Sequence, residues 1–123
     1  MRRVRVVIVE DNDVFREALE LMLGMREDIE IVAAVGDGTA AVAAALEHRP
    51  DVILMDYWLP GIDGAQATRE LLAQLPELRV VALTASADAV QRQALLAAGA
   101  VARLGKDEEL EEIVAAIQRA AST

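Results

Sequence analysis

The sequence contains no cysteine and a single histidine, His48. Disulfide bonds, thiol catalysis and cysteine-type zinc sites are therefore excluded. One histidine cannot supply a metal site built on two or three imidazoles, and it argues against a histidine-based catalytic triad. Aromatic residues make up only 2% of the 123 residues, so the sequence predicts a core of Ala, Val, Leu and Ile.

Positive charge and long apolar runs are also scarce. The formal net charge is −9, which argues against direct binding of nucleic acid or of a membrane surface, because both need a basic face. The apolar run after Arg3 spans six residues and is interrupted by Arg5, so it is too short for a secretory signal or a membrane span. We therefore expect a cytoplasmic protein. The acidic excess favours either plain solubility or the binding of a cation such as Mg²⁺.

Five short β-rich runs alternate with longer helical stretches along the chain. The third and fourth runs are entirely apolar, as is typical of strands that are buried on both faces of a parallel sheet. Five βα units in a chain of single-domain length predict an open, doubly wound α/β fold. The β-rich runs lie at residues 4–9, 29–35, 52–55, 80–83 and 101–104.

Two features predict the course of individual helices. Phe15, Ala18, Leu19, Met22 and Leu23 recur at helical spacing and predict an apolar stripe that faces the core. The alanine-rich stretch 88–98 predicts a later helix, and the glycine that follows it, at position 99, is well placed to end that helix in a left-handed conformation.

Polar side chains follow four of the predicted strands. The first strand ends in Glu10 and Asp11, the third in Asp56 and the fourth in Thr84, while Lys106 follows the fifth. In open α/β sheets, ligands bind outside the carboxyl ends of the strands. Each residue also has a simple structural interpretation, such as a helix cap or a surface lysine. The joint pattern favours a functional site at this edge.

The chemistry of these residue types is coherent. Neighbouring carboxylates repel one another unless a cation binds, and Mg²⁺ prefers oxygen ligands. Asp56 can attack phosphorus to form an aspartyl phosphate. The Thr84 hydroxyl and the Lys106 ammonium can stabilise the negative charge on the transferring phosphoryl group. The residues therefore predict Mg²⁺-dependent phosphoryl transfer.

Five segments match one known family in their order and spacing, and a lysine follows the last of them. They are residues 7–11, 53–56, 59–64, 82–85 and 98–100, followed by Lys106. Over essentially its whole length the sequence resembles the receiver domain of bacterial response regulators. Residues 11–17 and the junction of Lys106 and Asp107 resemble, within that family, the class that carries a helix-turn-helix DNA-binding output domain.

The resemblance implies a flavodoxin-like (βα)5 fold with strand order 2-1-3-4-5. It also implies a receiver over residues 1–119, with residues 120–123 as a tail or the start of a linker.

The resemblance implies a role for each residue of the metal site. Asp56 is the expected phosphoacceptor. Asp11 is the expected direct carboxylate ligand of Mg²⁺, and Glu10 is expected to act mainly through metal-bound water. The main-chain carbonyl of Trp58 would complete the site. The bulky Trp58 side chain also leads us to expect that the aspartyl phosphate is shielded from water and hydrolyses slowly.

The resemblance likewise implies how the phosphoryl group is bound and sensed. Thr84, the Ala85 N–H and Lys106 are expected to bind it, and Thr84 is expected to move toward it on activation. The family usually has an aromatic switch residue three positions before the lysine, whereas this chain has Arg103 there. We therefore do not expect an aromatic side chain to report activation in the usual way. We still expect phosphorylation.

The partners follow from the same resemblance. A phosphohistidine on a sensor histidine kinase is the expected donor, small acyl phosphates can replace it, and the domain would catalyse its own phosphorylation and dephosphorylation. The signal would leave through the fourth helix, fifth strand and fifth helix, within residues 88–120, where a homodimer is plausible. Regulation of transcription would require a DNA-binding domain that this sequence does not contain.

Three other functions compete with this interpretation. Phosphatases with an aspartate nucleophile usually place a second acid two residues later, where this chain has Trp58. A degenerate receiver that binds partners without phosphorylation is opposed by the complete polar set, although Arg103 favours it. A flavodoxin-like cofactor binder would need N–H groups and hydroxyls for the FMN phosphate, and acidic strand ends do not provide them.

Overall fold

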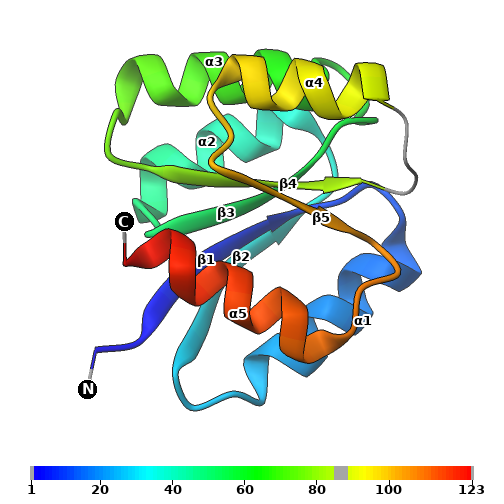
Figure 1. Cartoon of the computed structure of the whole chain (residues 1–123). Coiled ribbons are helices and arrows are strands. Elements are labelled where there is room, and N and C mark those ends of the chain that lie inside the picture. Colours follow the sequence, from blue (N-terminus) through cyan, green and yellow to red (C-terminus); the bar gives the residue numbers. More distant parts are fainter. Residues whose placement is uncertain (1, 85–88, 123) are drawn as a thin grey trace.

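The computed structural model describes residues 2–84 and 89–122, and it confirms the predicted alternation of strands and helices (Figure 1). All strand pairs are parallel, and the strand order β2-β1-β3-β4-β5 confirms the predicted flavodoxin-like topology. The elements are β1 Val4–Val9, α1 Asp13–Gly24, β2 Ile29–Val35, α2 Gly38–His48, β3 Val52–Asp56, α3 Gly64–Gln74, β4 Arg79–Thr84, α4 Ala89–Ala98, β5 Ala102–Gly105 and α5 Leu110–Ala121.

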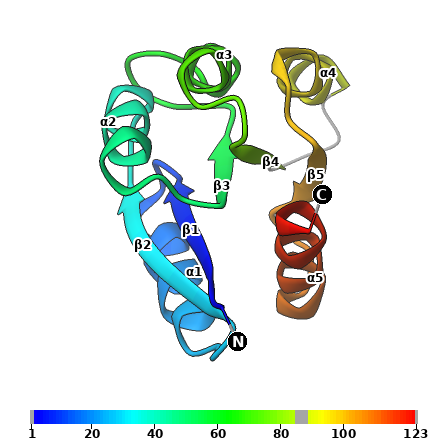
Figure 2. The same ribbon diagram turned by 90° about the vertical axis from the view of Figure 1, so that its left-hand side faces the viewer.

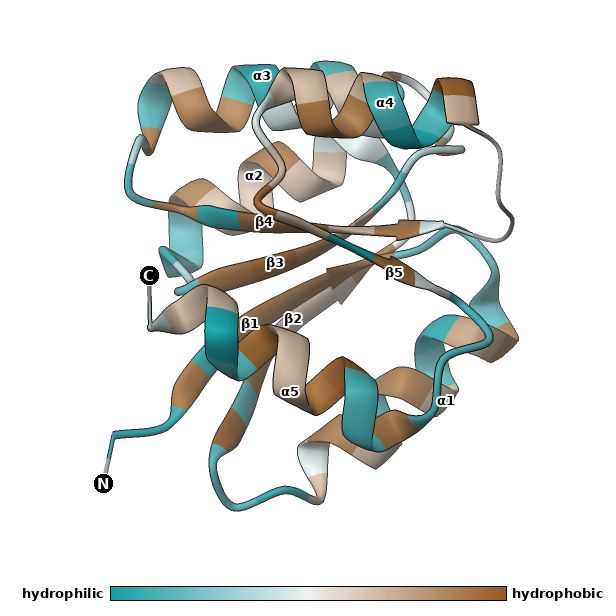
Figure 3. Cartoon of the chain, viewed as in Figure 1, coloured by the Kyte–Doolittle hydropathy of each residue, from teal (hydrophilic) through white to brown (hydrophobic). Residues whose placement is uncertain are grey.

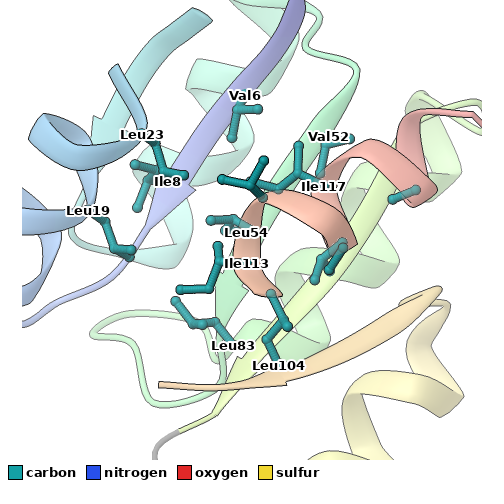
Figure 4. Packing of buried hydrophobic residues seen from close by; sticks show 14 of the residues in the cluster. Val6, Ile8, Leu19, Leu23, Val52, Leu54, Leu83, Leu104, Ile113 and Ile117 are labelled. Carbon is teal, nitrogen blue, oxygen red and sulfur yellow. The ribbon is translucent and has the colours of Figure 1, made fainter. Parts of the chain in front are cut away.

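Helices cover both faces of the sheet, α1 and α5 on one and α2, α3 and α4 on the other (Figures 1 and 2). Successive residues of a strand point to opposite faces. In β3, Val52 and Leu54 therefore pack toward α1 and α5 (Figure 4), whereas Ile53 and Met55 pack toward the other three helices. All of β3 is buried. The central strands are apolar along most of their length, whereas the helices alternate between apolar and polar residues (Figure 3).

The helices α1, α2 and α3 each begin at a side-chain cap. The side chains of Asn12, Asp37 and Asp63 each accept a hydrogen bond from a backbone N–H in the first turn of α1, α2 and α3. Asn12, and not Asp11 or Asp13, is the cap of α1. The Asp11 carboxylate is therefore not used as a helix cap, which leaves it available for the site that is built at the end of β1.

The predicted apolar stripe on α1 is confirmed for Leu19 and Leu23, which are buried, but Met22 is 39% exposed. A helix turns by about 100° per residue, which places Met22 well to the side of Leu23 and toward solvent. The predicted end of α4 is confirmed, because Gly99 has φ +120°. A Cβ at this position would lie 2.4 Å from Cδ1 of Leu72 on α3, so the glycine also allows α3 and α4 to approach.

The helix α5 continues through Ala121, so residues 120 and 121 are helical, and the domain boundary at residue 119 stays a prediction. Within the two described ranges, no helix combines the length and the apolar character that crossing a membrane would require. The cytoplasmic location also stays a prediction.

Candidate functional site

The parallel sheet brings the predicted polar residues together at one edge. Asp56 is the last residue of β3 and lies in register with Leu83, next to Thr84 at the end of β4. The backbone N–H of Lys106 donates a hydrogen bond of 2.8 Å to the carbonyl oxygen of Thr84. Glu10 follows β1, the other neighbour of β3. Glu10, Asp56 and Thr84 are all buried.

Three carboxylates form the acidic part of the site. Glu10, Asp11 and Asp56 each offer an oxygen, and these oxygens lie within 4.8 Å of one another. Oε2 of the fully buried Glu10 accepts a hydrogen bond of 2.8 Å from the Asn12 N–H. Oε1 of Glu10 lies in the same buried environment and is not used by the Asn12 N–H. Burial of an ionised carboxylate is costly unless a cation compensates it, so this group needs positive charge nearby.

Lys106, the only lysine of the chain, supplies one such charge. Its Nζ lies 2.5 Å from Oε1 of Glu10 and 3.1 Å from Oδ2 of Asp56, and it stands over the ring of Phe15, 5.4 Å from the centroid. Burial alone would lower the pKa of Lys106. The hydrogen bond to Glu10 and the charges of Asp56 and Glu10 outweigh burial and raise that pKa, so the ammonium stays charged at neutral pH.

The pKa of Asp56 is raised, although a lysine lies beside it. In an exposed aspartate, a neighbouring lysine would lower the pKa. Burial, followed by the negative charge of Glu10, raises the pKa of Asp56 to about 6, although Lys106 and the backbone N–H of Tyr57 act in the other direction. The lone ammonium therefore does not fully balance the carboxylates. A further cation at the site would lower the pKa of Asp56 again and so stabilise its ionised, nucleophilic form.

This pKa predicts how the stability of the metal-free protein depends on pH. The pKa of Asp56 is 3.8 when unperturbed and about 6 in the folded protein, so folding favours its protonated form and stability falls as pH rises from about 4 to about 6. Asp56→Asn cannot ionise. In EDTA the variant should match the parent below pH 4 and exceed it by up to about 3 kcal/mol above pH 7. Urea unfolding across this range measures the difference, and a gap that is independent of pH would contradict the assignment.

The donor set fits a hard divalent cation. All three side chains offer carboxylate oxygens, which Mg²⁺ prefers over nitrogen or sulfur. The pKa of Asp56, which burial and Glu10 raise even beside Lys106, is a further sign that the site can take more positive charge. Glu10, Asp11 and Asp56 are therefore the residues that could hold Mg²⁺.

The remaining predicted residues lie around this centre rather than in it. The Thr84 hydroxyl is buried and donates a long hydrogen bond of 3.4 Å to the carbonyl oxygen of Leu104. The Trp58 side chain is 63% exposed and contacts the Tyr57 ring edge to face, so shielding of an aspartyl phosphate by Trp58 stays a prediction. Arg103 is exposed on β5.

Ala85 lies outside the described residues, so the predicted contribution of its N–H to phosphoryl binding stays a prediction. Sequence reasoning missed two residues of the first turns of α1, Phe15 beneath Lys106 and Arg16 beside Glu10. Their only signal is their spacing from the acidic pair, four and five positions after Asp11. That spacing equally fits an ordinary helix, so it did not distinguish them.

Comparison with known proteins decides the family. The family model described as the response regulator receiver domain matches residues 6–118. The chain belongs to this family. The receiver domain of the putative response regulator NarL from Mycobacterium tuberculosis superposes with a TM-score of 0.93 at 34% sequence identity, covering 99% of this chain and 98% of that one.

Curated relatives support the same assignment. Response regulator GacA of Pseudomonas viridiflava is 37% identical over 115 residues, 94% of this receiver and 54% of GacA. Transcriptional regulatory protein LiaR of Bacillus subtilis is 36% identical over 117 residues, 95% of this receiver and 56% of LiaR. The receiver thus spans about half the length of these relatives.

Proposed function

We propose that this receiver accepts a phosphoryl group on Asp56 in a Mg²⁺-dependent reaction, and that the modification switches an output surface that regulates transcription through a DNA-binding domain. One observation carries the proposal. The Asp56 carboxylate ends a buried central strand, lies 3.1 Å from the sole lysine, and shares an acidic cluster with Glu10 and Asp11. This arrangement combines a nucleophile, a permanent cation and oxygen ligands for a second cation.

In the proposed step, a carboxylate oxygen of Asp56 forms a bond to phosphorus while the bond from phosphorus to the donor breaks. With a phosphohistidine donor, the bonding electron pair stays on the imidazole nitrogen, and with acetyl phosphate it leaves with acetate. Lys106 already pairs with Asp56 and is placed to follow the new phosphoryl oxygens. The buried Thr84 hydroxyl would turn from the carbonyl of Leu104 toward the same oxygens.

Glu10, Asp11 and Asp56 would hold Mg²⁺, with Asp11 as a direct ligand, Glu10 mainly through water, and the Trp58 carbonyl as a further ligand. Bound Mg²⁺ would neutralise negative charge on the phosphoryl group and on the clustered carboxylates. Asp11 is the exposed member of the cluster, whereas Glu10 is fully buried. That difference supports the assignment of Asp11 as the ligand that approaches an incoming cation directly.

The phosphodonor, we infer, is a phosphohistidine on a sensor histidine kinase that docks beside the site on α1. Val14, Leu21 and Met25 are 78%, 69% and 77% exposed. Their spacing of seven and four residues places Val14 and Leu21 on one side of α1, with Met25 in line with them just after the helix ends. This apolar stripe begins two residues after Asn12, close to the acidic cluster, and it suits an amphipathic helix of the donor.

The output surface that we propose is α4, β5 and α5, where a homodimer would also form. Thr84 and Lys106 connect the site to this surface, because β4 pairs with β5 and Lys106 follows β5 directly. Val90 and Leu96 on α4 and Val101 before β5 are exposed and offer apolar contact area. Arg103 on β5 would place a charged side chain where the family usually has the aromatic switch residue. Phosphorylation would shift the population of this surface between two states.

A receiver that binds partners without being phosphorylated is the competing function. Both proposals use the same fold, but only phosphorylation requires the Lys106 ammonium beside a nucleophilic Asp56. Incubation of the protein with acetyl phosphate should add one phosphoryl group to its intact mass in MgCl2 and none in EDTA. Absence of the adduct in MgCl2, together with no change in Trp58 fluorescence on adding beryllofluoride and MgCl2, would favour the phosphorylation-independent function.

A further inference from the structure

Arg16 contacts both ends of the segment Glu10–Asp13, which contains the acidic pair Glu10 and Asp11. Its side chain is only 19% exposed. One guanidinium nitrogen donates a hydrogen bond of 2.7 Å to the backbone carbonyl oxygen of Glu10, and the other lies 2.7 Å from Oδ1 of Asp13. The Asp13 pair is exposed and contributes little by itself. The bond to Glu10 is charge-assisted and largely shielded from water, so it is the stronger constraint.

The neighbouring loop confines this guanidinium. A Cβ placed on Gly36 would lie 3.0 Å from a guanidinium nitrogen of Arg16 and 3.8 Å from the carbonyl oxygen of Glu10. The Glu10 N–H in turn donates a hydrogen bond of 3.0 Å to the Val35 carbonyl. The backbone of Glu10 is therefore fixed on both sides, by the end of β2 at its N–H and by Arg16 at its carbonyl.

The charge of Arg16 and its hydrogen bonds should act on a bound cation in opposite directions. A guanidinium close to a cation site repels the cation, so removal of its charge alone would strengthen binding. A side chain that orients metal ligands improves binding, and loss of such an outer partner typically weakens metal affinity by about 10-fold to 100-fold. The sign of the change on mutation therefore separates the two effects.

We propose that Arg16 is a positioning residue that holds the Glu10–Asp13 segment in the conformation in which Glu10 and Asp11 present their carboxylates to a divalent cation. The inference rests on the metal site of the proposed function and extends it to a residue outside the ligand set. It predicts that loss of the guanidinium weakens cation binding, even though a positive charge is removed from the neighbourhood of the site.

Binding of Mn²⁺, which takes the same oxygen ligands as Mg²⁺, tests the proposal through the electron paramagnetic resonance signal of the free ion. Arg16→Gln should raise the dissociation constant about 10-fold, and Arg16→Lys should recover part of the loss. Arg26→Gln is the matched control, because it removes the same charge from a pair with Asp28 and Glu111 that lies away from the site. Arg26→Gln should bind as the parent does.

Gly36→Ala gives a second variant that keeps the arginine. The added methyl group would press on the guanidinium, lengthen its hydrogen bond to the Glu10 carbonyl by a few tenths of an ångström and should weaken Mn²⁺ binding less than Arg16→Gln does. Urea unfolding in EDTA identifies any variant whose fold is lost. If folded Arg16→Gln bound Mn²⁺ as tightly as the parent or more tightly, the inference about Arg16 would be overturned, but the proposed metal site would stand. Failure of the parent to bind Mn²⁺, and of MgCl2 to compete with it, would overturn the proposed metal site and this inference with it.

Discussion

Replacement of Lys106 by methionine should slow phosphorylation of Asp56 by acetyl phosphate about 100-fold at pH 7. The ammonium lies 3.1 Å from Oδ2 of Asp56 and is the cation placed to follow charge onto the transferring phosphoryl group. Loss of one preorganised donor of this kind typically costs a factor of about 100 to 1,000 in rate. The variant also leaves the Glu10 carboxylate without its partner, which raises the electrostatic cost of ionising Asp56.

The rate of appearance of the phosphorylated mass in MgCl2 measures this effect. Lys106→Arg is the control, because it keeps the positive charge but not the compact ammonium, and it should retain more activity than Lys106→Met. Circular dichroism verifies that both variants are folded. A Lys106→Met protein that phosphorylates as fast as the parent would show that the ammonium does not act on the reaction.

Replacement of Gly64 by alanine should destabilise the protein by about 3 kcal/mol or more. A Cβ on Gly64 would lie 2.0 Å from the backbone carbonyl oxygen of Asp56 and 3.0 Å from Cα of Tyr57. Overpacking against mobile side chains typically costs about 1–3 kcal/mol, and here the obstacle is the backbone of a buried central strand. The Gly64 N–H also donates a hydrogen bond to the Tyr57 carbonyl, which ties the start of α3 to the residue after Asp56.

Urea unfolding of Gly64→Ala measures the loss, and Gly24→Ala is its matched control. Gly24 is the last residue of α1, and an added Cβ there would meet nothing within 4 Å. Alanine at position 24 should therefore leave stability unchanged or raise it by up to about 1 kcal/mol. An unchanged free energy of unfolding for Gly64→Ala would contradict the close approach of α3 to Asp56 that the structure shows.

Most of the fold could be predicted because its local and global signals agree. Apolar runs such as Val52–Asp56 are short and bounded, and their continuous burial on both faces requires a parallel sheet between helices. The exposure of Met22 shows that helical periodicity alone does not predict which residues of an apolar stripe are buried. The periodicity gives the direction of the buried face but not its width. The packing of neighbouring helices determines that width, and no single segment contains that information.

The residues of the candidate site could also be anticipated, because parallel strands bring their carboxyl ends to one edge. The sequence could not predict that Lys106 would pair with both Glu10 and Asp56, which depends on the path of the chain after β5. Nor could it distinguish Asn12 from Asp11 and Asp13 as the cap of α1. The contact of Arg16 could not be predicted either. Arg16 donates its hydrogen bond to a backbone carbonyl, which every residue has, so the identity of residue 10 gives no sign of it.

The central claim is that Asp56 is the phosphoacceptor of this receiver, and intact mass after incubation with acetyl phosphate and MgCl2 tests it most directly. The parent and two variants with the same chemical change, Asp56→Asn and Asp107→Asn, would be compared, since Asp107 is an exposed aspartate that follows Lys106. The account predicts one added phosphoryl group on the parent and on Asp107→Asn, and none on Asp56→Asn. A phosphoryl group on Asp56→Asn at the rate of the parent would contradict it.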